Sequence, residues 1–424
     1  MKTLSSVKAA LGSGAAILLG GLLAAAPAQA STGSTVPCKT QALIAAINAA
    51  NGSGGERINL APGCTYRLTA ASSPNAMLGD TGLPAITSRI TLTGFRTTIA
   101  GNDSTFRILL VTGSGKLTLN GLTVTGGNTP GPGGGIFNLE GTLILNHSRV
   151  TGNSSAGGMM SGGGGIASGT LGTGPVGTAV LNFSRVDHNT TTNSAAGILN
   201  HGGTLILNAS KVNGNTAAAG GGGIASGPGG QGGPGSSILV VKFSQISGNT
   251  ANGGPMAGAG GLSNGGTATI IASKIDGNTA PGAPGGGILN HGIMTLTGSK
   301  VTGNTAPADG AGDQGIGGGI ANINLGPVTG TFDGGVLTIT FSQITRNTAS
   351  GQGGGIFEAT ITSSGPAAGG PLTIKFSQIT RNKAASGGGI FAVPGSPVTL
   401  KVTVVAKNTP DNCAPPGAIA GCKN

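Results

Sequence analysis

Aromatic and acidic residues are scarce in this 424-residue chain, and both scarcities narrow its possible functions. Tryptophan is absent and Tyr66 is the one tyrosine, so the sequence predicts no aromatic platform on which sugars could stack. The same lack of interleaved aromatic residues argues against nucleic-acid binding. Only 11 residues are Asp or Glu, which leaves few carboxylates for an acid–base pair or a Ca²⁺ site.

Glycine is abundant instead, with 87 residues, about three times its usual share. Such a composition can accompany disorder, but here the Gly-rich pieces alternate with short strand-like runs such as Leu143–Leu145 and Leu337–Ile339. No Gly-x-Gly-x-x-Gly segment follows a strand and opens a long helix, so the glycine runs are assigned to turns and not to phosphate binding. The Gly-rich calcium-binding repeat is also missing, and the sequence predicts no metal and no other cofactor.

A short phrase recurs along the chain: Val or Ile, two small or polar residues, then Asn, usually followed by Thr-Ala and later by Gly-Gly-Gly-Ile. A fixed phrase at variable spacing predicts a solenoid, in which each unit buries its apolar face only by stacking on its copies. Within residues 285–306 we expect three short strands, Gly287–Asn290, Ile293–Thr297 and Ser299–Val301. The sequence therefore predicts an all-β, single-stranded right-handed parallel β-helix of about eleven coils.

Two sets of asparagines fall at equivalent positions of the repeat. The first set ends the phrase, at Asn153, Asn189, Asn215, Asn249, Asn278, Asn304, Asn347, Asn382 and Asn408. The second set follows the Gly-Gly-Ile segment, at Asn138, Asn200, Asn264, Asn290 and Asn322. In coils stacked about 4.8 Å apart, buried amides can hydrogen-bond along such columns. Turn asparagines that tolerate left-handed geometry account for the same residues, and in both cases they are scaffold.

The N-terminus has the pattern of an export signal. Lys2 and Lys8 precede an apolar run, and Ala28-Gln29-Ala30 is a small-residue cleavage site, so residues 1–30 are predicted to be a signal peptide. No second apolar span follows, and we expect no transmembrane insertion. The mature protein is expected to be a monomer that is secreted, extracellular or loosely associated with the cell wall.

Both ends of a β-helix expose unpaired strands and need a cap. Residues 40–51 carry Leu43, Ile44 and Ile47 on one face, which predicts an N-terminal capping helix. We expect an N-terminal cap over residues 31–84, β-helix repeats over 85–409 and a closing tail over 410–424.

The four cysteines lie only near the two ends of the mature chain. An even number in an exported protein favours two disulfides, Cys38 with Cys64 and Cys413 with Cys422, over a metal site, which would need four convergent ligands.

The alternation of Gly-Gly-Gly-Ile with Val/Ile-x-x-Asn-Thr-Ala resembles the repeats of chlamydial polymorphic outer-membrane proteins. The capped coils, over about residues 38–422, resemble exported bacterial proteins of the right-handed parallel β-helix, pectate-lyase-like superfamily. This second resemblance implies lyases or hydrolases of acidic polysaccharides as the natural enzyme hypothesis. Val or Ile stands where the chlamydial repeats often have Phe, and simple secretion is expected here instead of surface display.

Such enzymes need clustered carboxylates, either around Ca²⁺ or as an acid–base pair. Asp187 and Asp276 share a repeat position but lie three coils apart, about 14 Å at about 4.8 Å per coil, and His201 and His291 repeat that separation. The remaining catalytic candidates are Asp309, Asp313, Asp333 and Glu358. Alternatively, these acids only solubilise a flexible loop.

Positive charge follows one edge of the predicted solenoid. In the phrase Ser-x-Val/Ile the middle residue should point outward, because its hydrophobic neighbour points inward. This residue is Arg149, Arg185, Lys211, Gln245, Lys274, Lys300, Gln343 or Gln378. Arg346 and Arg381 lie three residues after the last two glutamines. Without the two leader lysines, 20 Lys and Arg against 11 acids leave a net charge of +9, which suits a polyanionic partner.

These observations favour a secreted, non-catalytic, adhesin-like surface protein that binds an anionic polysaccharide or cell-wall polymer through a ladder of cations. The ladder comprises Arg149, Arg185, Lys211, Lys274, Lys300, Arg346 and Arg381. A solvated face that merely prevents edge association accounts for the same charges. The alternative function is a polysaccharide lyase or glycoside hydrolase acting on an acidic polysaccharide, with its site on loops 307–319 and 324–335.

Overall fold

The computed structural model describes residues 35–75, 77–102, 105–156, 162–170, 176–218, 220–228, 237–253, 258–309, 315–325, 335–362 and 365–424. The predicted signal peptide and the candidates Asp313 and Asp333 lie outside these ranges. Residues Thr35 to Asn424 form one compact unit. In the ranges given, no helix combines the length and hydropathy needed to cross a membrane.

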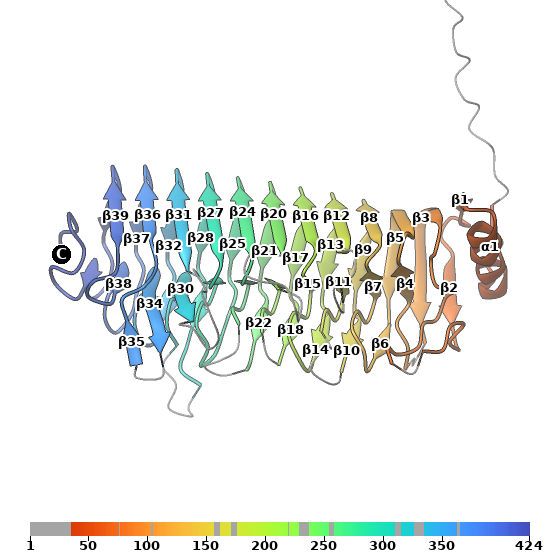
Figure 1. The fold of residues 1–424 in the computed structure, drawn as a ribbon, viewed down its shortest axis with the longest axis horizontal. Helices are drawn as coiled ribbons and strands as arrows, with labels where there is room; N and C mark the ends of the chain where they lie inside the picture. The colour runs from red at the N-terminus through yellow and green to blue at the C-terminus, as the bar shows by residue number, and fades with distance from the viewer. Residues whose placement is uncertain are drawn as a thin grey trace, which may run out of the picture. The chain divides into compact units, whose positions relative to one another are not determined.

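Parallel strands stacked coil on coil make up almost all of the regular structure (Figure 1). The first row of the largest sheet comprises β1 (Gly55–Asn59), β3 (Arg89–Gly101), β5 (Lys116–Thr125), β8 (Thr142–Asn146), β12 (Thr178–Asn182), β16 (Thr204–Asn208), β20 (Ile238–Lys242), β24 (Thr267–Ile271), β27 (Ile293–Thr297), β31 (Val336–Thr340), β36 (Leu372–Lys375) and β39 (Val398–Lys401). Its second row comprises β2 (Thr65–Leu68), β9 (Arg149–Thr151), β13 (Arg185–Asp187), β17 (Lys211–Asn213), β21 (Gln245–Ser247), β25 (Lys274–Asp276), β28 (Lys300–Thr302), β32 (Gln343–Thr345), β37 (Gln378–Thr380) and β40 (Val404–Ala406).

Two further rows of strands complete most of the coils. Two-residue strands form the third row: β6 (Asn128–Thr129), β10 (Ser154–Ser155), β14 (Thr190–Thr191), β18 (Thr216–Ala217), β22 (Thr250–Ala251), β29 (Thr305–Ala306) and β33 (Thr348–Ala349). The fourth row comprises β4 (Leu109–Thr112), β7 (Ile136–Leu139), β11 (Ile166–Gly169), β15 (Ile198–His201), β19 (Ile224–Gly227), β23 (Leu262–Asn264), β26 (Ile288–Asn290), β30 (Ile320–Leu325), β34 (Ile356–Thr362), β38 (Ile390–Ala392) and β41 (Cys413–Ala414). β35 (Gly365–Ala367) pairs antiparallel with β34.

The predicted all-β parallel β-helix with an N-terminal helix is confirmed by this arrangement. The prediction of three strands per coil was incomplete, because the Thr-Ala segments form the additional third row. Two residues are too few to give a hydrophobic period, and only their pairing with the next coil makes them strands.

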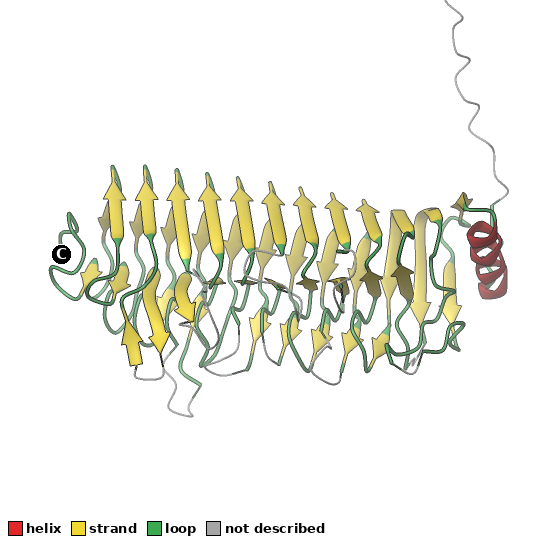
Figure 2. Cartoon of the chain, viewed as in Figure 1, coloured by secondary structure: helices red, strands yellow, loops and turns green. Residues whose placement is uncertain are grey.

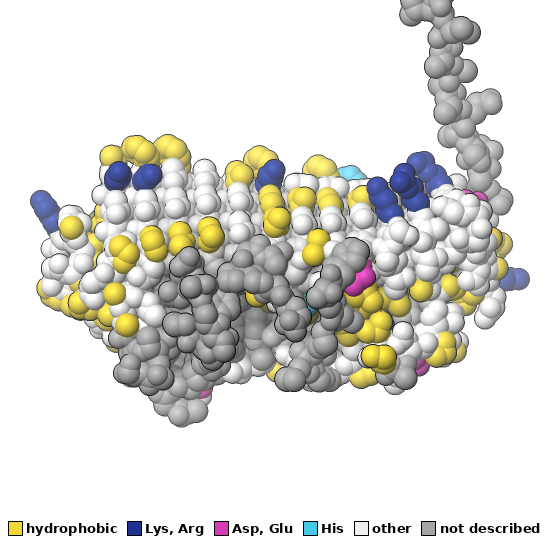
Figure 3. Space-filling view, in the orientation of Figure 1, with side chains coloured by type: hydrophobic (Ala, Val, Ile, Leu, Met, Phe, Trp, Pro, Cys, Tyr) yellow, Lys and Arg dark blue, Asp and Glu magenta, His cyan; other side chains and the backbone are white. Residues whose placement is uncertain are grey.

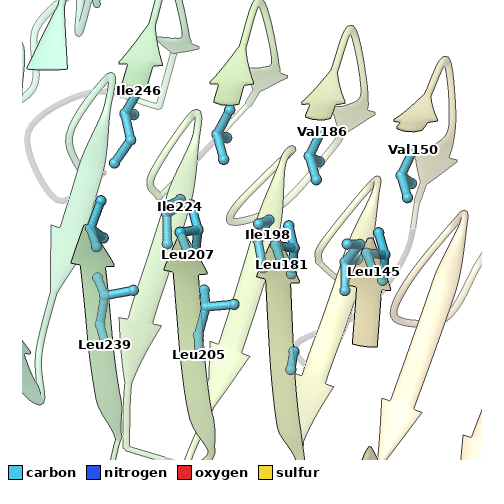
Figure 4. Close-up of a cluster of buried hydrophobic side chains, with 14 of the residues drawn as sticks. Leu145, Val150, Leu181, Val186, Ile198, Leu205, Leu207, Ile224, Leu239 and Ile246 are labelled. Carbon is cyan, nitrogen blue, oxygen red and sulfur yellow. The ribbon is translucent and has the colours of Figure 1, made fainter. Parts of the chain in front are cut away.

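The core consists of columns of aliphatic side chains that point into the coil (Figure 4). In β16 the burial pattern alternates, with Leu205 and Leu207 buried between half-buried neighbours. Leu207 pairs in register with Leu181 on the preceding coil and Val241 on the next. Since burying each such side chain stabilises by about 1.5–3 kcal/mol, the columns fix the register of the stack.

The first asparagine set forms a continuous hydrogen-bonded column, called the Asn column below, as the repeat predicts. Asn278 is fully buried, and its Oδ1 accepts bonds from the backbone N–H and the side-chain Nδ2 of Asn249, at 3.0 and 2.9 Å. Asn278 Nδ2 in turn donates to Asn304 Oδ1 at 2.9 Å. The same pattern links the members from Asn153 to Asn408, so their role is structural.

The Gly-Gly-Gly-Ile phrase recurs because the Asn column leaves no room beside it. A Cβ atom added at Gly287 would lie 2.9 Å from Asn304 Nδ2 and 2.6 Å from Gly319 O. Gly319 has the same relation to Asn347 on the next coil. The third glycine of each phrase is therefore the space that the amide column requires.

Both ends of the stack are closed (Figure 2). Helix α1 (Thr40–Gly52) buries Leu43, Ile47 and Ala50 against the first coils, and the Cys38–Cys64 disulfide links its N-terminal side to them. At the other end the Cys413–Cys422 disulfide closes the tail.

The tail also terminates the Asn column. Asn408 Nδ2 donates to Asn412 Oδ1 at 3.1 Å, and Asn412 Nδ2 donates to the carbonyl of Lys423 at 2.8 Å. Asn424 Oδ1 accepts from the backbone N–H groups of Asn412 and Cys413. The last amide of the column is therefore satisfied within the chain.

Candidate functional site

The outward residues of the second row form one column in register, called the basic column below. Arg185 pairs with Arg149 and Lys211, and Lys274 pairs with Gln245 and Lys300. The column continues through Gln343 to Gln378. The prediction that these side chains point outward is confirmed, because all five cations are exposed and each following Val or Ile is fully buried.

Two aspartates neutralise part of the basic column. Asp187, which is 1% exposed, accepts bonds from Arg149 Nε at 3.0 and 3.1 Å, and Arg185 Nε lies 3.6 Å from its Oδ2. Asp276 lies 2.9 Å from Lys274 Nζ and accepts a bond from Gln245 at 3.0 Å. Asp187 and Asp276 share a register position three coils apart, as expected, and each binds its own cations.

Two arginines continue the positive charge on the neighbouring turn. Arg346 and Arg381 lie at equivalent positions of successive coils and have left-handed backbone angles, φ 56° and 59°. With Gln343, Gln378 and two threonines they line a shallow groove of about 200 Å³. The structure thus brings these two predicted residues together beside the glutamine end of the basic column.

A second outward column, called the corner column below, lies between the first and second rows. Its members are His147, Phe183, Ala209, Phe243, Ala272, Gly298, Phe341, Phe376 and Val402. Each of them has a left-handed φ between 46° and 59°. Each of the first eight donates its N–H to the carbonyl just before the next member, as Phe243 does to Ile271 at 3.1 Å. The column is therefore in register from His147 to Val402.

The corner column corrects the prediction that the chain lacks an aromatic platform. Phe183, Phe243, Phe341 and Phe376 are 62, 68, 63 and 51% exposed. Figure 3 shows hydrophobic side chains along the edge where β31, β36 and β39 end in Figure 1, with Lys and Arg beside them. Phe341 and Phe376 stack with their centroids 5.1 Å apart, and His147 stacks on Phe183 at 5.1 Å.

The basic and corner columns enclose a groove of about 350 Å³ in the middle of the stack. Lys211, Lys274 and Lys300 line one side, and Phe243 stands between Ala209 and Ala272. Apart from Phe243, the corner-column residues that line the groove are small: Ala209, Ala272 and Gly298. This volume lies at the lower end of the range for small-molecule sites.

The predicted catalytic acids do not form a site in the described part of the chain. Asp309 is exposed on a loop and lies against Gly282. Glu358 is completely buried in the fourth row, at the register position of Asn322. An exposed acid and a buried acid of this kind lack the shared, open cleft that an acid–base pair needs.

Glu358 extends the second asparagine set. Asn264, Asn290 and Asn322 donate along the column in turn, and Asn322 Nδ2 donates to Glu358 Oε2 at 2.7 Å. Burial raises the pKa of Glu358 to about 9, against the lowering effect of its hydrogen bonds from Asn322 and the Gly370 backbone. The carboxyl is therefore protonated at neutral pH and stands in for an amide.

The two histidines lie apart, as their spacing predicts. Burial lowers the pKa of His291 to about 4, and its Nε2 lies 3.5 Å from Ser263 Oγ. Burial also lowers the pKa of His201, three coils away. Within the residues that the structure describes, no three His, Cys, Asp or Glu side chains form a group that could hold a metal ion.

No protein-family model matches the sequence, and no curated protein matches it either. Solved structures do resemble the fold. The A-module of mannuronan C-5 epimerase AlgE4 from Azotobacter vinelandii is 14% identical, with a TM-score of 0.48 over 87% of this chain and 91% of that one. The AlgE6 A-module from the same organism is 17% identical, with a TM-score of 0.43 over 89% and 95%. Pectate lyase Pel9A is 14% identical, with a TM-score of 0.35 over 70% and 72%.

Proposed function

We propose that this chain is a secreted, non-catalytic, adhesin-like protein that binds an anionic polysaccharide or cell-wall polymer along the basic column. The observation that supports this function most is the register of the cations. Arg149, Arg185 and Lys211 lie on consecutive coils, and Lys274 and Lys300 lie on the next pair of cationic coils. Cations repeated about every 4.8 Å match a partner whose negative charge is also repeated along a chain.

The location of the charge supports polymer binding over a purely solubilising role. Lys211 and Lys300 have no acidic partner among the described residues, and both line the 350 Å³ groove. Charges that serve only solubility need no common hollow, whereas a ligand needs contact area beside its charge partners. Two disulfides also suit an oxidising, non-cytoplasmic compartment.

The resemblance to chlamydial repeats bears on the scaffold alone. Its two phrases, Gly-Gly-Gly-Ile and Val/Ile-x-x-Asn, are accounted for by the packing of Gly287 and its equivalents on the Asn column. Neither phrase supplies a residue of the basic column. The proposed binding therefore rests on this chain's own outward residues.

Co-sedimentation tests the proposal. The purified protein is mixed with isolated bacterial cell walls or with an insoluble acidic polysaccharide at low and high salt, and the supernatant is assayed for released oligosaccharide. Retention that falls with salt, without release, is the expected result, since salt screens exposed charges over about 10 Å at 0.1 M. Absence of retention would contradict the proposal, and release of oligosaccharide would replace it with the lyase or hydrolase alternative.

A charge-reversed variant locates the binding surface. Lys274→Glu with Lys300→Glu should lower retention several-fold, because both lysines line the same groove. Lys39→Glu with Lys423→Glu is the matched control: both side chains are exposed, one precedes α1 and the other lies in the tail. Equal retention of the two double variants would refute the basic column as the binding surface.

A further inference from the structure

The residue type in the basic column is linked to the size of the corner-column residue in the same coil. In the coils with Lys211, Lys274 and Lys300 in the basic column, the residue two positions earlier in the corner column is small: Ala209, Ala272 and Gly298. In the coils with Phe243, Phe341 and Phe376, the basic column instead carries Gln245, Gln343 and Gln378. A lysine therefore occurs in each of these coils with a small corner residue. Coils with a ring carry a glutamine or, beside His147 and Phe183, an arginine.

The term slot is used here for the space beside one corner-column residue. The two stacked ring pairs show how side chains are arranged where rings fill consecutive slots. The ring planes of Phe341 and Phe376 are 12° apart, and those of His147 and Phe183 are 10° apart. Rings in the corner column thus present their faces along the stacking direction. Phe243 has the same φ as Phe341, 52°, but its neighbours in the column are Ala209 and Ala272, and all three line the groove.

Phe243 is a poor choice for any structural role at this position. Its left-handed φ disfavours a bulky side chain, and its ring remains 68% exposed. A ring that is both strained and exposed gains nothing from the core. A ligand on its face would bury this ring.

We infer that the groove over Phe243 binds the sugar rings of a uronic-acid polymer, with a pyranose stacked on the Phe243 face and its carboxylate paired with Lys274 or Lys211. This inference rests on the proposed function and names its ligand class. A pyranose has the thickness of the missing ring and an apolar C–H face for the phenyl group. The carboxylate of the stacked sugar pairs with a lysine beside the open slot, while the glycosidic bonds, which lie in the ring plane, lead across the stack. When Lys274 leaves its ion pair with Asp276, that aspartate keeps its bond from Gln245.

Filling the slot from within the chain provides the sharpest test. Ala272→Phe extends the pattern of Phe341 and Phe376 to this coil, so the chain supplies the ring that the ligand would supply. Titration calorimetry measures binding of oligogalacturonate and of poly-L-glutamate, a polyanion without sugar rings, at one ionic strength. Ala272→Phe should weaken oligogalacturonate binding about tenfold and leave poly-L-glutamate binding unchanged. Phe243→Ala, which removes the stacking face, should have the same selective effect.

Val402→Phe is the matched control, because it adds the same ring to the same column, at φ 47°, outside the groove. It should leave both affinities unchanged. The inference is overturned if Ala272→Phe and Phe243→Ala leave oligogalacturonate binding intact, or if they weaken both polymers equally. Single-stranded DNA is titrated as a third probe. If Ala272→Phe and Phe243→Ala weaken only its binding, the groove stacks nucleic-acid bases and the inference is overturned. Failure of the proposed function is distinguishable, since Lys274→Glu with Lys300→Glu would then change neither polymer.

Discussion

Glu358 makes the stability of this β-helix depend on pH in an unusual direction. Its side chain is completely buried, and burial raises its pKa from 4.5 to about 9. Between these values the carboxyl is protonated in the folded chain and ionised in the unfolded chain, so unfolding releases a proton and the free energy of unfolding falls as pH rises. Below about pH 4.5 both states are protonated and the loss disappears.

The magnitude follows from the size of the pKa difference. Each pH unit inside the window costs at most about 1.4 kcal/mol, so the step from about pH 5 to about pH 7 costs up to about 2.7 kcal/mol. Glu358→Gln keeps an oxygen to accept from Asn322 Nδ2 and cannot ionise. The variant should therefore lose this pH slope and be more stable than the wild type by about 1–3 kcal/mol near pH 7.

Guanidinium unfolding followed by far-ultraviolet circular dichroism measures this effect, because the chain lacks tryptophan. The midpoints of wild type and Glu358→Gln should diverge from about pH 5 to about pH 8 at unchanged m. Glu56→Gln is the control, since Glu56 is exposed in β1. Parallel midpoints of wild type and Glu358→Gln would refute the protonated, buried carboxyl.

Further predictions concern the columns and the caps. Asn278→Ala removes two acceptor and two donor bonds in the interior and should destabilise by about 2–5 kcal/mol in guanidinium unfolding, whereas Asn208→Ala, at a half-buried position, should cost less than half as much. Asp187→Asn releases Arg149 and Arg185 from their buried partner, so salt-dependent retention on acidic polysaccharide should increase; unchanged retention would mean that these arginines do not contribute. Cys413→Ser with Cys422→Ser opens a loop with a sequence separation of 9, while the Cys38–Cys64 bond stays intact, and should lower the free energy of unfolding by about 2–3 kcal/mol. Hydrogen exchange in the last coil should rise first. Uniform protection along the stack would contradict this prediction.

The sequence was sufficient for the fold because the same few residues solve the same packing problem in every coil. The Val/Ile-x-x-Asn phrase places a buried aliphatic residue and a buried amide at fixed separation, and the glycine beside the amide follows from its lack of space. The capping helix was also predictable, since Leu43 and Ile47 leave one apolar face to bury. Both are local patterns that only one stacking arrangement satisfies.

The corner column was missed because phenylalanine is normally read as a core residue. A signal was present: Phe183, Phe243, Phe341 and Phe376 each stand directly before the serine of the Ser-x-Val/Ile phrase. Other coils have His147 or Gly298 at that place, and an inward position would not accept both. The left-handed turn that makes the position point outward is visible only in three dimensions.

Glu358 was considered as a catalytic acid because carboxylates are rare in the chain. Its repeat position gives a different answer, since it stands two residues after Ile356 as Asn322 stands two residues after Ile320. Counting from the Gly-Gly-Gly-Ile phrase would have placed it in the second asparagine set. Its burial, and hence its protonation, depend on the neighbouring coils and could not be predicted from composition.

The closed end of the Asn column has a consequence for assembly. From Asn153 on, each coil presents to the next the same amide, the same carbonyls and the same strand edges, so an unfinished stack would accept a second molecule as readily as its own next coil. Such an addition is head-to-tail and does not close on itself, which is the geometry of filament growth. In the tail, Asn412, Lys423 and Asn424 take up the hydrogen bonds that Asn408 would otherwise offer to a further coil. The tail therefore opposes the addition of a second molecule at this end of the stack.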